Sequence, residues 1–571
     1  MHDSKSDVSA VWHRLAVAAA VLLLLTSLCG WRRSTSPVAD RLAPFAASAT
    51  GTESKDLPAG AASRRTIMVP MRDGVRLATE VVLPEGDGPW PVVLTRTPYG
   101  RTGGALKRLT NYLKRDIACV TQDFRGLFDS EGEFTLSGLF LDNIQDGHDT
   151  VEWIAEQDWC NGRVGITGGS GPGIAAKLAL MSNPPHLVAA ETNVAASNVH
   201  RYAGFSGGVR RAHMVDNWLE GRGVDVEMWP RPRPTPFNKE QRSLDFRGRD
   251  IDTPLTDVAG WFDIFSQSAL DDFAALCHNG KTFTVVGPTG HGNIRGLHWP
   301  GEDTVNQVRR HTPGLKPLLM DVEMDRSTLY YYLMGDARSG GPPGNVWKKT
   351  HKWPVPHTDT PVYMTADGRL QRQRPDDKEA SLTYEYDPEN PVPTIGGANL
   401  ILPKGPMDQR PLSDRDDILR FSTGPLEKHV QITGKVLVKL HVSSDVPDTT
   451  FMAKLIDIYP DGYQALILDS AVMTRYREGL DEPKPMKAGN VYEVTIDLWS
   501  TALVFDKGHR IAVHVTSSNS PRYEVHPNTF DPVNSYDEAN VAHNTVHLSS
   551  EHPSRVILPV VEPGTVEDFE P

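Results

Sequence analysis

Three residues, far apart in the chain, have the types and the order that acyl-transfer chemistry needs. Such a site requires a nucleophile, a base that takes its proton and an acid that orients the base. Ser170, Asp263 and His291 supply these three types. They follow one another in the order serine, acid, histidine, and each comes just after a predicted strand. The pattern predicts a serine that attacks a carbonyl carbon.

Ser170 lies between a strand-like run and a helix-like run, in a turn of small residues. The run Val164–Thr167 ends at two glycines, and Gly171, Pro172 and Gly173 follow the serine. A sharp strand-to-helix turn exposes the hydroxyl and places the free N–H groups of a helix beside it. Small neighbours are a steric requirement, because the flanks of such a turn approach closely. Pro172 suits the first helical turn.

The same stretch allows two other interpretations. Gly171, Gly173 and Ala176 fit a degenerate dinucleotide-binding fingerprint, with Glu191 at a suitable distance for a ribose contact. A Walker loop is excluded, because neither Lys-Ser nor Lys-Thr follows the last glycine. At least four predicted strands precede the turn, whereas a nucleotide-binding loop normally follows the first strand of its sheet. This position favours the nucleophile, and an ordinary tight turn stays open.

The partners of the serine have rivals nearby. The rivals are Asp257 and Asp271 for the acid, and His278 and His298 for the base. We prefer His291 because it alone follows a predicted strand within a glycine-flanked loop. A tetrahedral oxyanion also needs hydrogen-bond donors, for which the N–H of Gly171 and the hydroxyl of Tyr99 are candidates. Tyr99 comes just past an earlier predicted strand.

No metal ion or organic cofactor is expected, because serine, histidine and aspartate suffice for this chemistry. The cluster Asp146, His148 and Asp149 contains ligand types, but no companion ligands follow at a suitable spacing. We interpret it as the N-terminus of a helix with capping acids.

Strand and helix patterns alternate from Thr66 to about Pro288, which predicts a parallel sheet of the α/β class. The alternation breaks where Arg, Trp and Pro crowd together, and there we expect an inserted, partly helical cap. Short alternating strands after about Lys348 predict an all-β sandwich of jelly-roll type. The expected parts are a signal peptide or anchor (1–30), a linker (31–63), an α/β-hydrolase domain (64–198 and 249–347), the helical cap (199–248) and a C-terminal jelly roll (348–571).

Composition narrows the class of protein further. The chain has 571 residues, of which 39% are hydrophobic and 23% charged, as in ordinary multidomain globular proteins. Its net charge of -13 argues against nucleic acid as a partner. The 4 cysteines have neither a C-x-x-C pair nor zinc spacing, so we expect no disulfide framework.

The N-terminus has the pattern of a targeting segment. Basic residues precede the apolar run Leu15–Leu28, which has the length of a signal-peptide core and is short for a membrane span. Cys29 and Ala47–Ala49 offer competing processing sites. We expect export to the periplasm or the exterior, with membrane attachment through this segment as one outcome. Cleavage, lipidation and retention all stay open.

Longer motifs surround the candidate residues. They are Arg96–Tyr99, Asp123–Phe134, Gln157–Gly165, Gly260–Asp263, Gly287–His291 and Asp387–Gly397. Together they resemble the cocaine esterase and X-prolyl dipeptidyl-peptidase group of α/β-hydrolases, which also includes α-amino acid ester hydrolases and glutaryl acylases. The resemblance runs from about Thr66 to Pro559.

The resemblance implies a role for each candidate. Ser170 matches the family nucleophile, Asp263 the triad acid, His291 the base, and Tyr99 the tyrosine that completes the oxyanion hole with the N–H of Gly171. The chain departs from the family at Gly171, where a tyrosine usually follows the nucleophile. Since glycine keeps its N–H, the oxyanion hole is expected to survive, while an aromatic wall beside the acyl site is expected to be lost.

These features predict a serine hydrolase that cleaves an ester or amide bond through an acyl-enzyme intermediate, as esterases and acylases do. One alternative is an X-prolyl dipeptidyl-peptidase that recognises a free N-terminal amine through a carboxylate in the cap. A second alternative is a non-catalytic protein whose jelly roll binds a glycan. The expected partner is a small ester, an amide or a short peptide. The sequence leaves its identity and the oligomeric state open.

Overall fold

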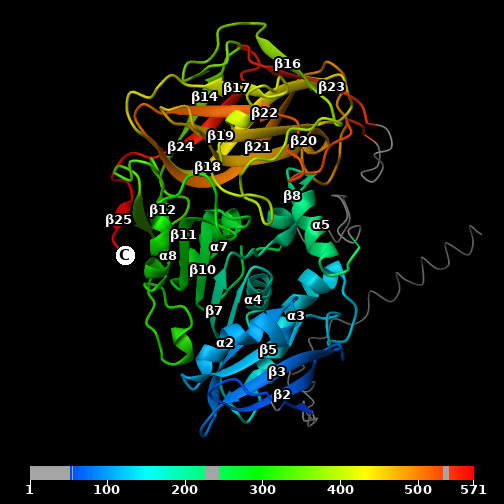
Figure 1. The fold of residues 1–571 in the computed structure, drawn as a ribbon, viewed down its shortest axis with the longest axis vertical. Coiled ribbons are helices and arrows are strands. Elements are labelled where there is room, and N and C mark those ends of the chain that lie inside the picture. The colour runs from blue at the N-terminus through cyan, green and yellow to red at the C-terminus, as the bar shows by residue number, and fades with distance from the viewer. Residues whose placement is uncertain (1–51, 55, 226–243, 531–538) are drawn as a thin grey trace, which may run out of the picture. The chain divides into compact units, whose positions relative to one another are not determined.

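The computed structural model describes residues 52–54, 56–225, 244–530 and 539–571 (Figure 1). An α/β domain contains a 12-stranded sheet, and a β domain contains sheets of 7 and 4 strands. The expected signal or anchor segment 1–30 lies outside the described residues. None of the described helices is long and apolar enough to cross a membrane.

The predicted parallel sheet is confirmed. Its strands β5, β4, β6, β7, β10, β11 and β12 run parallel in this order, and β3 and β13 continue the sheet antiparallel at either side. The strands are β2 (Ala61–Pro70), β3 (Arg76–Pro84), β4 (Trp90–Thr97), β5 (Ala118–Asp123), β6 (Cys160–Gly169), β7 (Leu187–Asn193), β10 (Leu255–Phe262), β11 (Thr282–Gly290), β12 (Thr328–Leu333) and β13 (Val346–Thr350). Both faces of the central strands are buried, which explains their continuous apolar runs.

Helices cover the two faces of this sheet (Figure 1). They are α2 (Leu106–Leu113), α3 (Leu136–Ala155), α4 (Gly171–Met181), α7 (Ser266–Leu276) and α8 (Gly301–Arg309). The helix predicted from Asp146 onward begins earlier, at Leu136, so the interpretation of Asp146 and Asp149 as capping acids is wrong. Asp146 instead pairs with Arg125 at 2.6 Å, and Asp149 pairs with Arg72 at 2.6 Å. Two arginines from neighbouring segments explain why the acids lie inside the helix.

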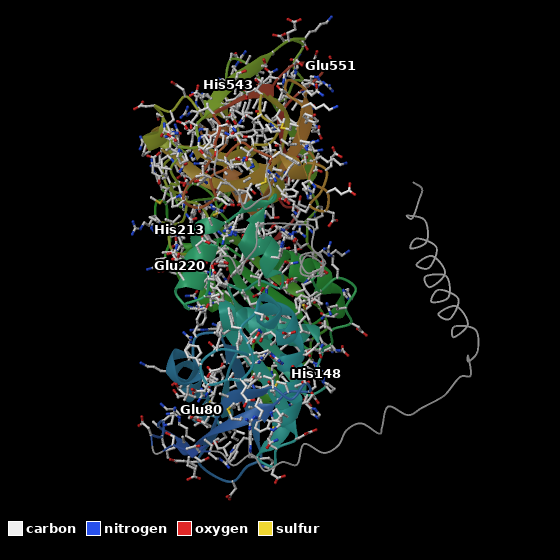
Figure 2. All side chains as sticks on the ribbon, turned by 90° about the vertical axis from the view of Figure 1, so that its right-hand side faces the viewer. Glu80, His148, His213, Glu220, His543 and Glu551 are labelled. Atoms are coloured by element: carbon white, nitrogen blue, oxygen red, sulfur yellow. The ribbon has the colours of Figure 1, made fainter. Side chains whose placement is uncertain are left out.

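The described part of the cap contains short elements. They are the π-helical turn η3 (His200–Gly204), the strands β8 (Phe205–Ser206) and β9 (Val209–Arg210), and the helix α5 (Ala212–Glu220). Figure 2, which labels His213 and Glu220 of α5, shows this helix beside the junction of the two domains. The rest of the predicted cap, 226–243, lies outside the described residues. The apolar face of α5 packs with Ile264 and Phe265 of the α/β domain.

The predicted all-β domain is confirmed as two antiparallel sheets, and most of their buried apolar side chains belong to one core. The larger sheet contains β14 (Thr358–Met364), β15 (Leu370–Gln371), β16 (Ser381–Tyr386), β18 (Val430–Ser444), β21 (Tyr492–Phe505), β23 (Ala542–His547) and β24 (Arg555–Val560). The smaller contains β17 (Leu419–Ser422), β19 (Thr450–Ile458), β20 (Gln464–Met473) and β22 (Arg510–Thr516). Its assignment as a jelly roll stays a prediction.

The domain limits differ from the expected ones at both ends. Strands β1 (Thr52–Glu53) and β2 begin within the segment expected as a linker. Strand β13 crosses the expected limit at Lys348, and the last strand, β25 (Glu567–Phe569), leaves the β domain and pairs antiparallel with β13. Strand pairing explains these differences, because an edge strand gains backbone partners when another segment is added to it.

Candidate active site

Ser170 occupies a strained turn between β6 and α4. Its φ of 56° and ψ of -125° lie in a region that non-glycine residues rarely adopt. The N–H of Ser170 donates to the carbonyl of Asn193 at 3.0 Å, and its carbonyl accepts from the N–H of Ile174 at 2.8 Å. The two hydrogen bonds hold the strained residue from both sides, so the hydroxyl stays at the carboxyl end of the sheet.

Two glycines make this turn sterically feasible, as the sequence predicted. A Cβ atom added to Gly168 would lie 2.4 Å from the carbonyl carbon of Pro172. One added to Gly173 would lie 2.7 Å from the Cβ atom of Ala195. Both contacts are far too short for carbon atoms, so strand, turn and helix can approach this closely only without side chains.

The structure brings Ser170, Asp263 and His291 together. The Nε2 atom of His291 lies 3.0 Å from Ser170 Oγ, and its Nδ1 atom lies 2.7 Å from Asp263 Oδ2. Asp263 follows β10 and is fully buried, and its Oδ1 atom accepts the N–H of Phe265 at 2.7 Å. A carboxylate on Nδ1 keeps the proton there, which leaves Nε2 free to accept the proton of the serine.

Three of the four rival residues are engaged elsewhere, and the fourth, His278, lies at an exposed position. Asp257 accepts from Lys177 at 2.6 Å, and Asp271 accepts from the hydroxyl of Tyr202. His298 contacts Glu302 at 3.1 Å. Glu191, which the nucleotide interpretation needs as a ribose ligand, is paired with Arg309.

Tyr99 follows β4, and its hydroxyl lies directly over Gly171. A Cβ atom on Gly171 would be 2.7 Å from Tyr99 Oη and 3.0 Å from Tyr99 Cε2. The phenol therefore occupies the space that a side chain at position 171 would need. This contact places the hydroxyl next to the N–H of the residue after the serine, where a second oxyanion donor belongs.

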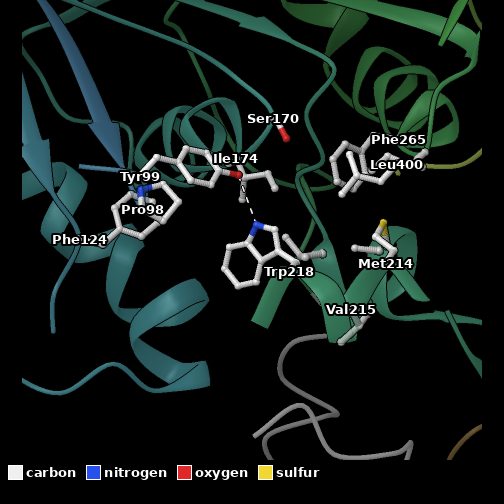
Figure 3. Close-up of a pocket in the computed structure, with 14 residues that line it drawn as sticks. Pro98, Tyr99, Phe124, Ser170, Ile174, Met214, Val215, Trp218, Phe265 and Leu400 are labelled. Atoms are coloured by element: carbon white, nitrogen blue, oxygen red, sulfur yellow. Dashed lines mark hydrogen bonds between the residues drawn. The ribbon is translucent and has the colours of Figure 1, made fainter. Parts of the chain in front are cut away.

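A small apolar cavity of about 60 Å³ opens beside Ser170 (Figure 3). Its lining includes Phe124, Ile174 and Phe265 of the α/β domain, Met214, Val215 and Trp218 of α5, and Leu400 of the β domain. Despite the glycine at position 171, aromatic surface is kept here, because Tyr99, Phe124, Trp218 and Phe265 all contribute to it. None of the described residues that line the cavity carries a charge.

Several of these lining residues were missed from the sequence. Met214, Val215 and Trp218 lie at helical spacing i, i+1, i+4, a signal that could have identified them as one face of a helix. Leu400 had no such signal, because it lies in a loop. The loop is held by Lys404, whose Nζ donates to the carbonyls of Leu400 at 2.7 Å and His291 at 3.2 Å.

Among the described residues, one group could hold a metal ion, and it does not line this cavity. Asp336, Asp506 and His509 each offer one ligand atom, and these three atoms lie within 4.8 Å of one another. His509 Nδ1 lies 2.9 Å from the buried carboxylate of Asp457, and His429 Nδ1 lies 2.6 Å from Asp506. These contacts form a network of histidines and acids near the β21–β22 turn.

Family models match most of the described chain. Residues 73–242 match the X-Pro dipeptidyl-peptidase model of the S15 family, and residues 321–557 match the C-terminal non-catalytic domain of X-Pro dipeptidyl-peptidases. The chain is 35% identical to cocaine esterase of Rhodococcus sp. (strain MB1 Bresler), over 87% of this chain and 98% of that relative.

Solved structures show the same architecture. An α-amino acid ester hydrolase superposes with a TM-score of 0.74 at 25% identity, covering 92% of this chain and 100% of that chain. An aminopeptidase from a marine sediment Thaumarchaeota archaeon also gives 0.74 at 25% identity, covering 94% of this chain and 100% of that chain.

Proposed function

The chain belongs to the cocaine esterase and X-Pro dipeptidyl-peptidase family of serine hydrolases, and from this membership we propose that it is an esterase for compact, uncharged acyl groups. Ser170 is the nucleophile, His291 the base and Asp263 the acid that orients it. Tyr99 and the N–H of Gly171 form the oxyanion hole. The cavity beside Ser170 receives the acyl group.

The geometry supports a two-step reaction. His291 Nε2 takes the proton of Ser170 Oγ as that oxygen attacks the ester carbonyl, and the Tyr99 hydroxyl and the Gly171 N–H donate to the resulting oxyanion. The intermediate collapses when the carbon–oxygen bond of the alcohol breaks and His291 returns the proton to the leaving alkoxide. Water then attacks the acyl-enzyme, with His291 again as base, and releases the acid and free Ser170.

The apolar lining of the cavity is the observation that favours an uncharged acyl group as substrate. A dipeptidyl-peptidase must hold a free ammonium group near the scissile bond, and a desolvated ammonium needs a carboxylate partner. The described lining offers none, and its volume of about 60 Å³ suits a compact group. An uncharged acyl group enters such a cavity without this desolvation cost.

A matched set of substrates tests the proposal. We expect a higher kcat/KM for nitrophenyl esters of compact uncharged acids than for a nitrophenyl ester of an α-amino acid or an X-Pro nitroanilide. Ser170→Ala should lower turnover by about 10⁶-fold, and a fluorophosphonate should label the wild-type protein but not this variant. Preference for the ammonium-bearing substrates would support the dipeptidyl-peptidase instead. A protein that neither labels nor turns over any ester would contradict the enzyme proposal.

The proposal extends to location. Basic residues followed by the apolar run Leu15–Leu28 support export. Fractionation of expressing cells should find the protein outside the cytoplasm, and removal of residues 1–30 should keep it inside. Recovery of the full-length protein in the cytoplasm would contradict export.

A further inference from the structure

Tyr99 is half exposed and needs support from outside its own strand. The residue is 41% exposed, and it lies in the loop that follows β4. Its backbone N–H donates to Thr97 Oγ1 at 3.0 Å, which fixes the main chain but not the ring. Gly171, below the hydroxyl, has no side chain to pack against it. An oxyanion donor acts strongly only when it is held in place before the reaction.

Trp218 of α5 contacts the hydroxyl directly. Its indole Nε1 lies 3.3 Å from Tyr99 Oη (Figure 3). An indole N–H can only donate, so the phenol oxygen is the acceptor of this hydrogen bond. The proton of the hydroxyl is then free to be donated to another oxygen. Because a hydroxyl that accepts one hydrogen bond becomes a stronger donor of its own, the indole also polarises Tyr99.

Arg222, just past the end of α5, joins both rings. Its guanidinium carbon lies 4.7 Å from the centroid of the Tyr99 ring and 3.9 Å from that of Trp218. One guanidinium nitrogen donates to the carbonyl of Trp218, which ties the arginine to the helix. A cation against the phenol also favours the negative charge that builds up on its oxygen as the proton is shared with the oxyanion.

We propose that Trp218 and Arg222 are positioning residues that hold the Tyr99 hydroxyl over Gly171 and direct its proton toward the oxyanion. The inference rests on the proposed role of Tyr99 in the oxyanion hole. It assigns a second task to the cap, whose helix α5 also lines the acyl cavity through Met214 and Val215. The helix that contacts the acyl group is therefore also the helix that orients a donor to its carbonyl oxygen.

A double-mutant cycle separates this role from packing. Trp218→Phe removes the N–H and keeps an aromatic ring, and Arg222→Met removes the charge and keeps a long side chain. We expect Tyr99→Phe to lower kcat by about 10²–10³-fold, as loss of an oxyanion donor does. Trp218→Phe and Arg222→Met should each lower kcat by about 10-fold, which is only part of the loss expected for Tyr99→Phe. The KM for a compact ester should change much less. In the Tyr99→Phe background neither substitution should lower kcat further, because the hydroxyl that they orient is absent.

The outcomes distinguish this inference from the proposed function. Equal losses with and without the Tyr99 hydroxyl would show that the two residues only support packing, and the inference would be wrong. Full activity of Trp218→Phe beside an impaired Tyr99→Phe would also overturn it and leave the oxyanion role of Tyr99 intact. Full activity of Tyr99→Phe would instead show that Tyr99 is not an oxyanion donor, and the inference would lose its basis.

Arg222→Lys provides a matched control. Lysine keeps the charge but lacks the planar group that stacks on both rings, so it should restore activity only in part. Melting temperatures of all variants verify that they are folded. If Arg222→Met does not fold, the cycle between Trp218→Phe and Tyr99→Phe decides the question alone.

Discussion

At the scale of single residues, the absence of a side chain at position 171 shapes the reacting end of the site. The Tyr99 hydroxyl occupies the place of a Cβ atom there, so the glycine and the tyrosine fit as a pair. A larger residue at 171 requires the phenol to lie elsewhere. In this chain the Tyr99 phenol thus fills the space that a side chain at position 171 would take.

Gly171→Ala tests this pairing. The new methyl group would approach Tyr99 Oη to 2.7 Å and displace it, so kcat should fall by about 10²-fold, toward the value of Tyr99→Phe. The melting temperature should change little, because position 171 begins α4 and alanine favours a helix. Gly169→Ala is the matched control, since its Cβ would meet no atom closer than 3.5 Å. If Gly171→Ala leaves kcat unchanged, the position of the Tyr99 hydroxyl does not contribute to catalysis.

At the scale of elements, one buried lysine connects the segments that carry the triad. Lys177 of α4 donates to Asp257 of β10 at 2.6 Å and to Asp272 of α7 at 2.9 Å, and all three side chains are buried. Its third hydrogen bond reaches the carbonyl of Ala195 at 2.9 Å. The helix that begins after Ser170 is thereby joined to the strand that ends before Asp263.

Lys177→Met should destabilise the protein strongly. It would leave two carboxylates buried without their cation, which typically costs about 3–5 kcal/mol. Thermal or urea unfolding measures the loss, and Lys107→Met on α2 is the control, because that lysine is exposed. If both variants unfold alike, the buried lysine does not stabilise this junction.

A row of basic residues crosses the smaller sheet of the β domain. His514 of β22 lies opposite Arg420 of β17 and Lys454 of β19. Burial, then the charge of Lys454 and of Arg420, lowers the pKa of His514 from 6.5 to about 3. Between these pH values the unfolded chain binds a proton that the folded protein does not.

This difference makes the protein sensitive to acid. The stability contributed by neutral His514 is fully present above pH 6.5 and is lost progressively as the pH falls toward 3. His514→Gln should therefore show a shallower fall of melting temperature over this range. His278→Gln, at an exposed position, should keep the slope of the wild type. An identical slope in all three proteins would contradict the effect.

At the scale of the whole molecule, the features that could be predicted from the sequence are those that local residue patterns determine. Apolar runs identified the strands of the α/β domain, apolar alternation identified those of the β domain, and the glycines around Ser170 identified the turn, because each signal lies within a few residues. The start of α3 was missed, since its acids pair with arginines that are distant in sequence. Leu400 and the return of β25 were missed for the same reason: they depend on which surfaces meet after folding, and no spacing along the chain records that.

Strand β25 has a consequence for how the two domains are joined. The chain leaves the α/β sheet after β13 and comes back beside it at β25, where Phe569 also packs on Tyr330 with ring centroids 4.7 Å apart. The β domain is thus inserted into the other domain as a closed loop, with its entry and exit on adjacent strands. A break between the β domain and β25 would leave the β domain covalently attached through β13, whereas after a break that follows β13 only non-covalent contacts, including the pairing of β25 with β13, would hold it. The domain that supplies Leu400 to the cavity wall is accordingly held by one covalent connection at β13 and by the backbone pairing of β25.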